Sequence, residues 1–191
     1  SVLLADFNND GWKDIHITNG VGRDFINADF LEFSNQTFDA IADKKEQQKR
    51  IKEKLASLNS VNLSNYLFIN NHDYFYKDSS QQGGINEPSL SNGAAYVDLD
   101  NDGDLDLVVN NINKEAFVFV NNTIQKSVPI QSHFLKLILK GDEKNKHAFG
   151  AKICLYAGGK MQMQEQDPVR GYYSSVDQDL IFGLGSGTTV D

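Results

Sequence analysis

Two short acidic segments with the same spacing constrain this chain more than any other feature. The first acidic loop runs from Asp6 to Asp14 and reads DFNNDGWKD, and the second acidic loop runs from Asp98 to Asp106 and reads DLDNDGDLD. Small and apolar residues precede each loop and alternating apolar residues follow it, so each loop is expected to join two β-strands. Carboxylates this close repel one another, and the loops therefore need a partner that supplies positive charge.

Both loops place oxygen-bearing side chains at positions one, three, five and nine, and glycine at position six. These side chains are Asp6, Asn8, Asp10 and Asp14 in the first loop, and Asp98, Asp100, Asp102 and Asp106 in the second. Gly11 and Gly103 permit a sharp turn, after which position seven, Trp12 or Asp104, offers its backbone carbonyl. Such ligands suit calcium, because zinc prefers nitrogen and sulfur and magnesium retains more of its water. Two Ca²⁺ sites are predicted.

Two other interpretations use the same residue types. An EF-hand loop begins in the same way, but it needs a glutamate at position twelve and a helix on each side, and position twelve here is Ile17 or Val109 within a strand pattern. Acidic β-turns without a metal also favour aspartate, asparagine and glycine. The identical ligand spacing in two copies favours the metal.

The acidity of the chain is confined to these loops. The chain has 26 acidic and 18 basic residues and a net charge of -8, and eight of the acids lie in the two loops, so the remaining 18 balance the bases. No basic run is dense enough to follow a phosphate backbone, so no nucleic-acid partner is expected. No segment is apolar for 18 residues, so no membrane-spanning segment is expected in this chain. Cys154 alternates with apolar residues and is predicted to be a packed thiol.

The segment around the first acidic loop is repeated around the second acidic loop, at an offset of 92 residues between Asp6 and Asp98. Much of this offset comes from residues 23–64, which are rich in helix formers. Their apolar residues recur at helical spacing, at Phe38, Ile41, Ile51, Leu55 and Leu58. This pattern predicts a helical insertion that packs one narrow apolar face on its host.

Each repeat reads as strand, acidic loop, strand, turn and strand. NYLFINN and YFYKDSS are expected to form a hairpin, and DLVVNN and AFVFVNN repeat the arrangement after the second loop. Repeated units of four antiparallel strands are typical of β-propeller blades. The loops resemble the calcium loops of FG-GAP repeats, also called VCBS-type repeats, which form propellers in integrin α-subunits and many secreted bacterial proteins. The resemblance implies the same ligands as those named above, and a structural metal that ties a hairpin loop.

The C-terminal third has a different residue pattern. HFLKLILKG, AFGAKICLYAGGKMQMQEQ, GYYSSV and LIFGLG are short alternating segments with glycine turns, which predicts another all-β unit from about Gln131. GAKICLYAGGK, RGYYSS and FGLG resemble the ASPIC/UnbV module, which follows such propellers in the cartilage acidic protein family and its bacterial relatives. The resemblance covers most of Ser132 to Asp191. In that family the module continues into a further strand, so this chain is expected to be a fragment with a truncated module.

No catalytic constellation stands out. Four scattered histidines are present, namely His16, His72, His133 and His147, and no serine or cysteine lies in a nucleophile motif. His16, between two isoleucines, is expected to face solvent or a channel. Gly183, Gly185 and Gly187 lack the spacing of a nucleotide-binding loop and are interpreted as turn glycines. No catalytic or cofactor-binding residue is predicted.

One amphipathic patch, formed by Arg170, Tyr172 and Tyr173, could bind a sugar or a peptide. Aromatic residues on a strand are also ordinary core residues, and both interpretations are open.

The expected fold is mainly β, a partial β-propeller with a helical insertion and a small all-β module. Its parts are blade strands with the first calcium loop at 1–22, the insertion at 23–64, blade strands with the second calcium loop at 65–130, and the ASPIC/UnbV-like module at 131–191. The expected function is a non-enzymatic calcium-binding scaffold, outside the cell or on its surface, that binds a protein or glycan ligand. Exposed strand edges could promote self-association.

The alternative is a part of a secreted glycan-processing enzyme. Its active site would lie in missing blades, or would use free acids such as Asp29, Asp39 or Asp177.

Overall fold

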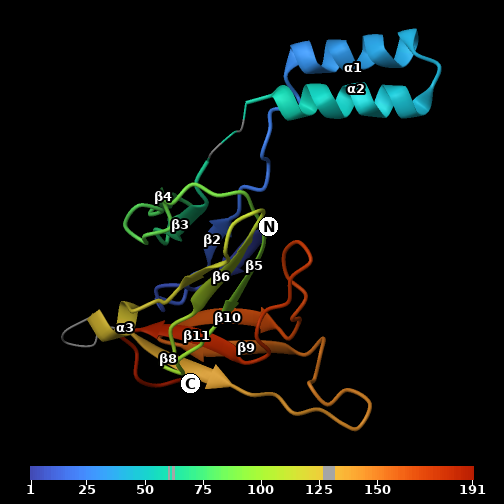
Figure 1. Cartoon of the computed structure of the whole chain (residues 1–191). Coiled ribbons are helices and arrows are strands. Elements are labelled where there is room, and N and C mark those ends of the chain that lie inside the picture. The colour runs from blue at the N-terminus through green and yellow to red at the C-terminus, as the bar shows by residue number, and fades with distance from the viewer. Residues whose placement is uncertain (60, 62, 127–131) are drawn as a thin grey trace. The chain divides into compact units, whose positions relative to one another are not determined.

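The computed structural model describes the chain except residues 60, 62 and 127–131 (Figure 1). It contains two compact units, one formed by Ser1–Gly20 with Ser64–Asp191 and one formed by Val21–Leu63. The second unit spans the part of the chain in which the helical insertion was expected, at 23–64. The boundary expected near Gln131 lies outside the described residues.

The unit Val21–Leu63 is a helical hairpin. Helices α1 (Ala28–Ala40) and α2 (Lys44–Ser57) contact each other and lie antiparallel (Figure 1). Asn27 caps α1, because its side chain accepts a hydrogen bond of 2.9 Å from the Asp29 amide, and Asp43 caps α2 in the same way. The helices therefore begin where the sequence supplies capping side chains. No helix in the described part of the chain is long and apolar enough to cross a membrane.

Few apolar residues hold the two helices together. Phe30 is buried, whereas Phe38 of the predicted stripe is 54% exposed. The Lys54 ammonium lies 5.6 Å from the centre of the Phe33 ring, and the Gln47 side chain donates a hydrogen bond of 3.1 Å to the Phe38 carbonyl. Cation–π and polar contacts thus supplement a thin apolar stripe.

The larger unit begins with a four-stranded antiparallel sheet in the order β1-β2-β3-β4. Its strands are β1 (Val2–Ala5), β2 (Asp14–Ile17), β3 (Tyr66–Asn70) and β4 (Tyr76–Asp78). The first acidic loop joins β1 to β2, and the helical unit is inserted between β2 and β3. The predicted hairpin of NYLFINN and YFYKDSS is confirmed by the pairing of β3 with β4.

A second antiparallel sheet repeats this arrangement with three strands. They are β5 (Ser91–Val97), β6 (Asp106–Asn111) and β7 (Phe117–Phe119), in that order. Asp106 pairs with Val97 as Asp14 pairs with Ala5, so both acidic loops close at the same place in their sheets. A short helix, α3 (Thr123–Lys126), follows β7. The described strands thus form repeated antiparallel sheets, but no closed propeller.

The C-terminal segment contributes two more pairs of strands. β8 (His133–Leu137) pairs with β11 (Leu180–Gly185), and β9 (Lys152–Ala157) pairs with β10 (Lys160–Glu165). The expected all-β unit is confirmed at this level. GYYSSV, however, is not a strand.

Instead, the GYYSSV segment forms a turn closed by an isolated bridge between Val169 and Ser175. Gly171 and Tyr173 both have positive φ angles, of 72° and 47°, which interrupt extended structure. The sequence interpretation missed this because aromatic residues also have high strand propensity.

Strand β11 is buried on both faces. One face contributes Ile181 to a core whose other buried residues come from β1, β5, β6, the two acidic loops and the segment before β11, namely Leu3, Ala5, Phe7, Ala94, Leu105, Leu107, Val109 and Val176. The opposite face places Leu180 and Phe182 in a second core with Leu155. The two cores share this strand, so the C-terminal segment and the two repeated sheets pack as one unit.

Three residue-level predictions are wrong. Cys154 is exposed, because Ile153 and Leu155 on either side of it face the second core and the alternation of β9 turns the thiol outward. His16 is fully buried and does not face solvent, and burial lowers its pKa to about 4. Gly183 lies within β11 and is not a turn glycine.

Gly183 is needed because the first acidic loop lies directly against β11. A Cβ atom at this position would lie 2.2 Å from Asp6 Oδ2 and 2.6 Å from Asn9 Cα. The neighbouring Gly185 amide donates a hydrogen bond of 2.8 Å to the Asn9 carbonyl. Strand and loop backbones thus approach too closely for a side chain.

Gly183→Ala is therefore expected to destabilise the fold by more than the roughly 1–3 kcal/mol typical of overpacking, because loop backbone must move. Gly158→Ala is the control, since a Cβ there would meet no atom within 4 Å and its cost comes only from the positive φ angle of 55°, which Gly183 does not share. Chemical denaturation of both variants measures the difference. Equal losses of unfolding free energy would contradict the close-packing argument.

Candidate metal centre

The first acidic loop is organised by carboxylates that accept hydrogen bonds from its own backbone. Asp6 accepts from the amides of Asp10 (3.1 Å) and Gly11 (2.8 Å). Asp14, at the other end, accepts from the Phe7 amide at 2.9 Å. These bonds force the loop into a tight turn with the carboxylates on its inner side.

The second acidic loop repeats two of these bonds at the equivalent positions. Asp98 accepts from the Asp102 amide at 3.1 Å, and Asp106 accepts from the Leu99 amide at 2.8 Å. Position four has φ near +57° in both copies, 56° at Asn9 and 59° at Asn101. Two segments 92 residues apart therefore fold to the same local structure.

The next strand also contributes a backbone amide to each loop. Asn70, at the end of β3, donates to Asp14 Oδ1 at 2.9 Å, and Asn121, after β7, donates to Asp106 Oδ1 at 2.7 Å. Both asparagines belong to NN pairs that follow an aromatic strand. That shared signal was available in the sequence, but these residues were not singled out as part of the site.

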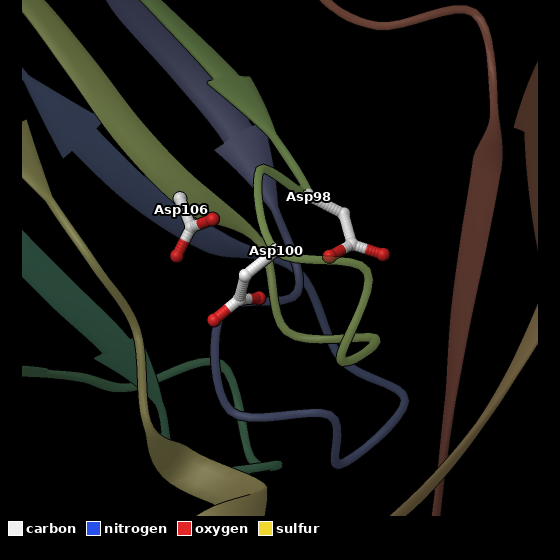
Figure 2. Close-up of side chains that lie close together, drawn as sticks. All are labelled: Asp98, Asp100 and Asp106. Carbon is white, nitrogen blue, oxygen red and sulfur yellow. The ribbon is translucent and has the colours of Figure 1, made fainter.

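Three carboxylates of the second loop converge. Asp98, Asp100 and Asp106 each present an oxygen atom within 4.8 Å of the others, and they form the one such acidic group among the described residues (Figure 2). Asp98 and Asp106 are buried and Asp100 is exposed. Three carboxylates around one point, reachable from solvent, form a donor set that fits a hard divalent cation.

Other predicted ligands of the second loop have different partners. The Asp102 carboxylate accepts hydrogen bonds from the Asp104 amide (2.8 Å) and the Gln125 side chain. The Asp104 carboxylate is fully buried and accepts from Asn9 and from the Ile124 amide, so only its backbone carbonyl is available for the role predicted.

Among its predicted ligand positions, the first loop differs from the second at positions three and seven. Asn8 occupies the place of Asp100, and its amide donates a hydrogen bond of 2.9 Å to Asp10. Asp10 also accepts from the Trp12 amide at 2.8 Å, and His72 Nε2 lies 2.8 Å from its other oxygen. The His72 ring stacks on Trp12 with centroids 5.5 Å apart. No spacing rule in the sequence indicated that His72 would reach this loop.

The two acidic loops are joined directly. Asn9 is fully buried, and its side-chain amide donates to Asp104 Oδ1 at 2.7 Å and to the Gly103 carbonyl at 3.1 Å. Asn121 adds a link, because its side chain donates to the Phe7 carbonyl at 2.6 Å. Any ion that orders one loop therefore acts on the other through these bonds.

A lysine of the C-terminal segment reaches the second loop. Lys136 Nζ, on β8, lies 3.4 Å from Asp98 Oδ2 and 3.2 Å from Asp179 Oδ2. Burial lowers the pKa of Lys136, but Asp179 and Asp98 raise it more, so the ammonium stays charged. This cation neutralises part of the negative charge of the loop.

Burial makes the first loop hard to ionise. It raises the pKa of Asp6 to about 6 and that of Asp14 to about 7. Backbone hydrogen bonds and, at Asp6, the charge of Lys13 oppose the shift only in part. Burial likewise raises the pKa values of Asp102 and Asp104 in the second loop. The buried negative charge lacks sufficient compensation from protein groups.

The remaining candidates do not gather at a site. Asp29 and Asp39 lie exposed on α1, and Asp177 accepts hydrogen bonds from the next two backbone amides. His147 is exposed and stacks on Phe149, and His133 pairs with Gly185 in the sheet. Among the residues described here, none of these acids or histidines belongs to a group of three metal-ligating side chains.

Fold and loops together define a mainly β protein in which repeated antiparallel sheets carry acidic turn loops. Within it, residues 141–191 match the protein-family model described as ASPIC and UnbV, which confirms the resemblance noted for this segment. The match includes β9, β10 and β11 but begins after β8, although β8 pairs with β11. No curated protein matches the chain.

The link between the loops predicts a difference between two equivalent asparagines. Asn9→Ala leaves the buried Asp104 carboxylate without one of its donors and is expected to cost about 2–3 kcal/mol of unfolding free energy. Asn101→Ala, at the same loop position and a similar φ angle, loses only an exposed 3.3 Å contact with Lys136. Urea denaturation of both variants separates the contribution of the hydrogen bonds between the loops from that of the shared backbone conformation. Equal losses of unfolding free energy in the two variants would contradict a stabilising link through Asn9.

The raised pKa of Asp14 predicts a pH dependence in calcium-free buffer. Because its pKa rises from 3.8 to about 7 on folding, the folded state keeps a proton that the unfolded state releases, and stability falls as pH rises through this window. The slope is at most about 1.4 kcal/mol per pH unit. His16 acts in the opposite direction, since its lowered pKa adds stability as pH rises from about 4 to 6.5.

Comparison with Asp14→Asn removes the contribution of His16, which both proteins share. The stability of the wild type minus that of the variant should decrease from pH 4 to pH 7, measured by thermal denaturation at half-unit steps. A difference that stays flat across this range would show that Asp14 ionises normally.

Proposed function

We propose that this chain is a calcium-binding, non-enzymatic scaffold in which each acidic loop holds one Ca²⁺ ion. One observation carries the proposal, namely that two loops 92 residues apart share ligand spacing, hydrogen-bond pattern and backbone conformation. In the second loop, Asp98, Asp100, Asp102 and Asp106 would supply carboxylate oxygens, with the Asp104 carbonyl beside them. Asp6, Asn8, Asp10, Asp14 and the Trp12 carbonyl would take the corresponding places in the first loop.

The ion would supply the positive charge that the loops lack. The protein provides Lys136 beside Asp98, but burial still raises the pKa values of four loop carboxylates. A divalent cation among oxygen ligands offsets both the repulsion and the desolvation of these groups. Its role would be structural, because each loop connects adjacent strands of a sheet.

The two sheets are best interpreted as neighbouring blades of a β-propeller of the FG-GAP or VCBS type. Support comes from the antiparallel order β1-β2-β3-β4, from the same order in β5-β6-β7, and from the acidic loop after the first strand of each. The ASPIC and UnbV match would then mark a module that follows the blades. The loops of such a protein would work outside the cell or on its surface, where free calcium is high enough for weak sites of about 0.1–1 mM.

Calcium binding predicts a large change in thermal stability. At a free calcium concentration of about 100 times the dissociation constant, each site adds about 2.7 kcal/mol, which corresponds to several degrees in melting temperature. Scanning calorimetry in EDTA and in calcium measures the shift, and isothermal titration measures the stoichiometry, expected to be two. An unchanged melt together with no heat of binding would refute the proposal.

Asp100→Ala is the sharpest variant because Asp100 is exposed and its loss costs the fold little. It should abolish or weaken one of the two binding events while leaving the melt in EDTA close to that of the wild type. Asp29→Ala, an equally exposed acid on α1, is the matched control and should leave both sites intact.

A further inference from the structure

A hollow of about 340 Å³ lies between the β5–β6 hairpin and the turn that contains Tyr172 and Tyr173. Its size falls in the range of sites that accommodate small ligands. The turn and the hairpin both belong to the larger unit, and Gly93 of β5 brings them close together. A Cβ at Gly93 would lie 3.0 Å from Ser174 Oγ and 3.3 Å from the Tyr172 carbonyl.

The lining of the hollow carries no charge, although 23% of the residues of the chain are charged. Ala95 and Val108, paired across β5 and β6, contribute small apolar surface. Asn92 and Asn110 contribute side-chain amides, and neither amide makes a hydrogen bond with another described residue. The hollow thus offers free donors and acceptors without a charge, which favours a neutral polar ligand.

Two tyrosine rings stand at the edge of the hollow. Tyr172 is 56% exposed and Tyr173 is 93% exposed, with ring centroids 4.7 Å apart and planes at 76°. Tyr173 has φ of +47°, a conformation that costs a residue with a side chain about 1–3 kcal/mol. Exposure and a positive φ angle do not by themselves distinguish Tyr173, since Tyr74 shows both. Tyr173 also lines the hollow, whereas Tyr74 does not, and this position favours a binding role.

The turn that carries these rings is held in place before any ligand arrives. The Tyr172 amide donates to Ser1 Oγ at 2.7 Å, and Ser174 Oγ donates to the Tyr172 carbonyl at 2.8 Å. The Arg170 side chain donates to the Asp167 and Glu165 carbonyls at 3.0 and 3.2 Å, so it braces the base of the turn and does not line the hollow. Such preorganisation reduces the entropy lost on binding.

We propose that this hollow is a subsite for a neutral glycan. The apolar C–H face of a pyranose ring stacks on exposed aromatic rings, and its hydroxyl groups pair with amides and hydroxyls that act as both donor and acceptor. Tyr172 and Tyr173 supply the aromatic surface, and Asn92 and Asn110 supply the amides. The subsite would define the class of ligand that the scaffold binds, and this inference therefore rests on the proposed function.

The experiment uses the whole chain and a panel of neutral oligosaccharides built from glucose, mannose, galactose or N-acetylglucosamine, with sulfated and uronic-acid chains for comparison. Titration calorimetry in calcium should detect binding of at least one neutral class and no preference for charged chains. Tyr173→Ala and Asn110→Ala should each weaken this binding about tenfold, or about 1.4 kcal/mol.

Tyr74→Ala is the matched control. Tyr74 is fully exposed, also has a positive φ angle of 68° and lies far along the chain between β3 and β4, so its loss should change glycan affinity by less than about twofold. Circular dichroism of each variant verifies the fold.

Three results would overturn the subsite, namely no binding to any neutral chain, binding that Tyr173→Ala leaves intact, or binding through Tyr173 of charged chains or peptides only. A calcium-dependent melt alongside any of these would leave the calcium scaffold standing. If calcium does not change the melting temperature while sugar binding still depends on Tyr173, the calcium scaffold proposal is refuted and the subsite is not.

Discussion

Repulsion between buried carboxylates is the constraint on which the larger unit depends. Each acidic loop folds by turning its carboxylates inward to accept backbone hydrogen bonds, and the same bonds bring the negative charges together. The protein answers part of this cost with Lys136, which lies 3.4 Å from Asp98, and with the amides of Asn70 and Asn121. What remains uncompensated is visible in the raised pKa values of Asp6 and Asp14, and it is this missing positive charge that the proposed divalent ion would supply.

The loops also organise the packing of the C-terminal segment. Strand β11 contributes side chains to both cores, and it can do so because Gly183 lets its backbone approach the first loop at Asp6 and Asn9. On the other side, a Cβ at Gly103 would lie 2.0 Å from the Phe134 ring of β8, so the second loop and the paired strand β8 are equally close. The acidic loops, the two repeated sheets and the C-terminal strands therefore share their contacts, and order at the loops is transmitted to the strands packed on them.

The sequence allowed prediction of those features that depend on local pattern. Ligand spacing located both acidic loops, alternation located the strands around them, and polar helical composition located the insertion, because each signal lies within a few neighbouring residues. Features that arise from tertiary contact were missed. His72 reaches Asp10 only through the pairing of β3 with β2, and Asn9 is indistinguishable from Asn101 in sequence although only Asn9 is buried between the loops. Cys154 and His16 were assigned to the wrong environments because alternation shows that two faces exist but not which face meets the core.

The turn at Tyr172 and Tyr173 illustrates how a local and a tertiary signal combine. In the sequence, RGYYSS reads equally well as a core strand and as an exposed patch, since tyrosine favours both. The positive φ angles of Gly171 and Tyr173 exclude the strand, and the close approach of Gly93 to Ser174 fixes the turn against β5. With the backbone in this turn, both tyrosine rings lie outside the two cores and line the hollow together with Asn92 and Asn110. Rigid attachment to a strand that the acidic loops already hold is what makes such an exposed aromatic pair suited to recognition rather than to packing.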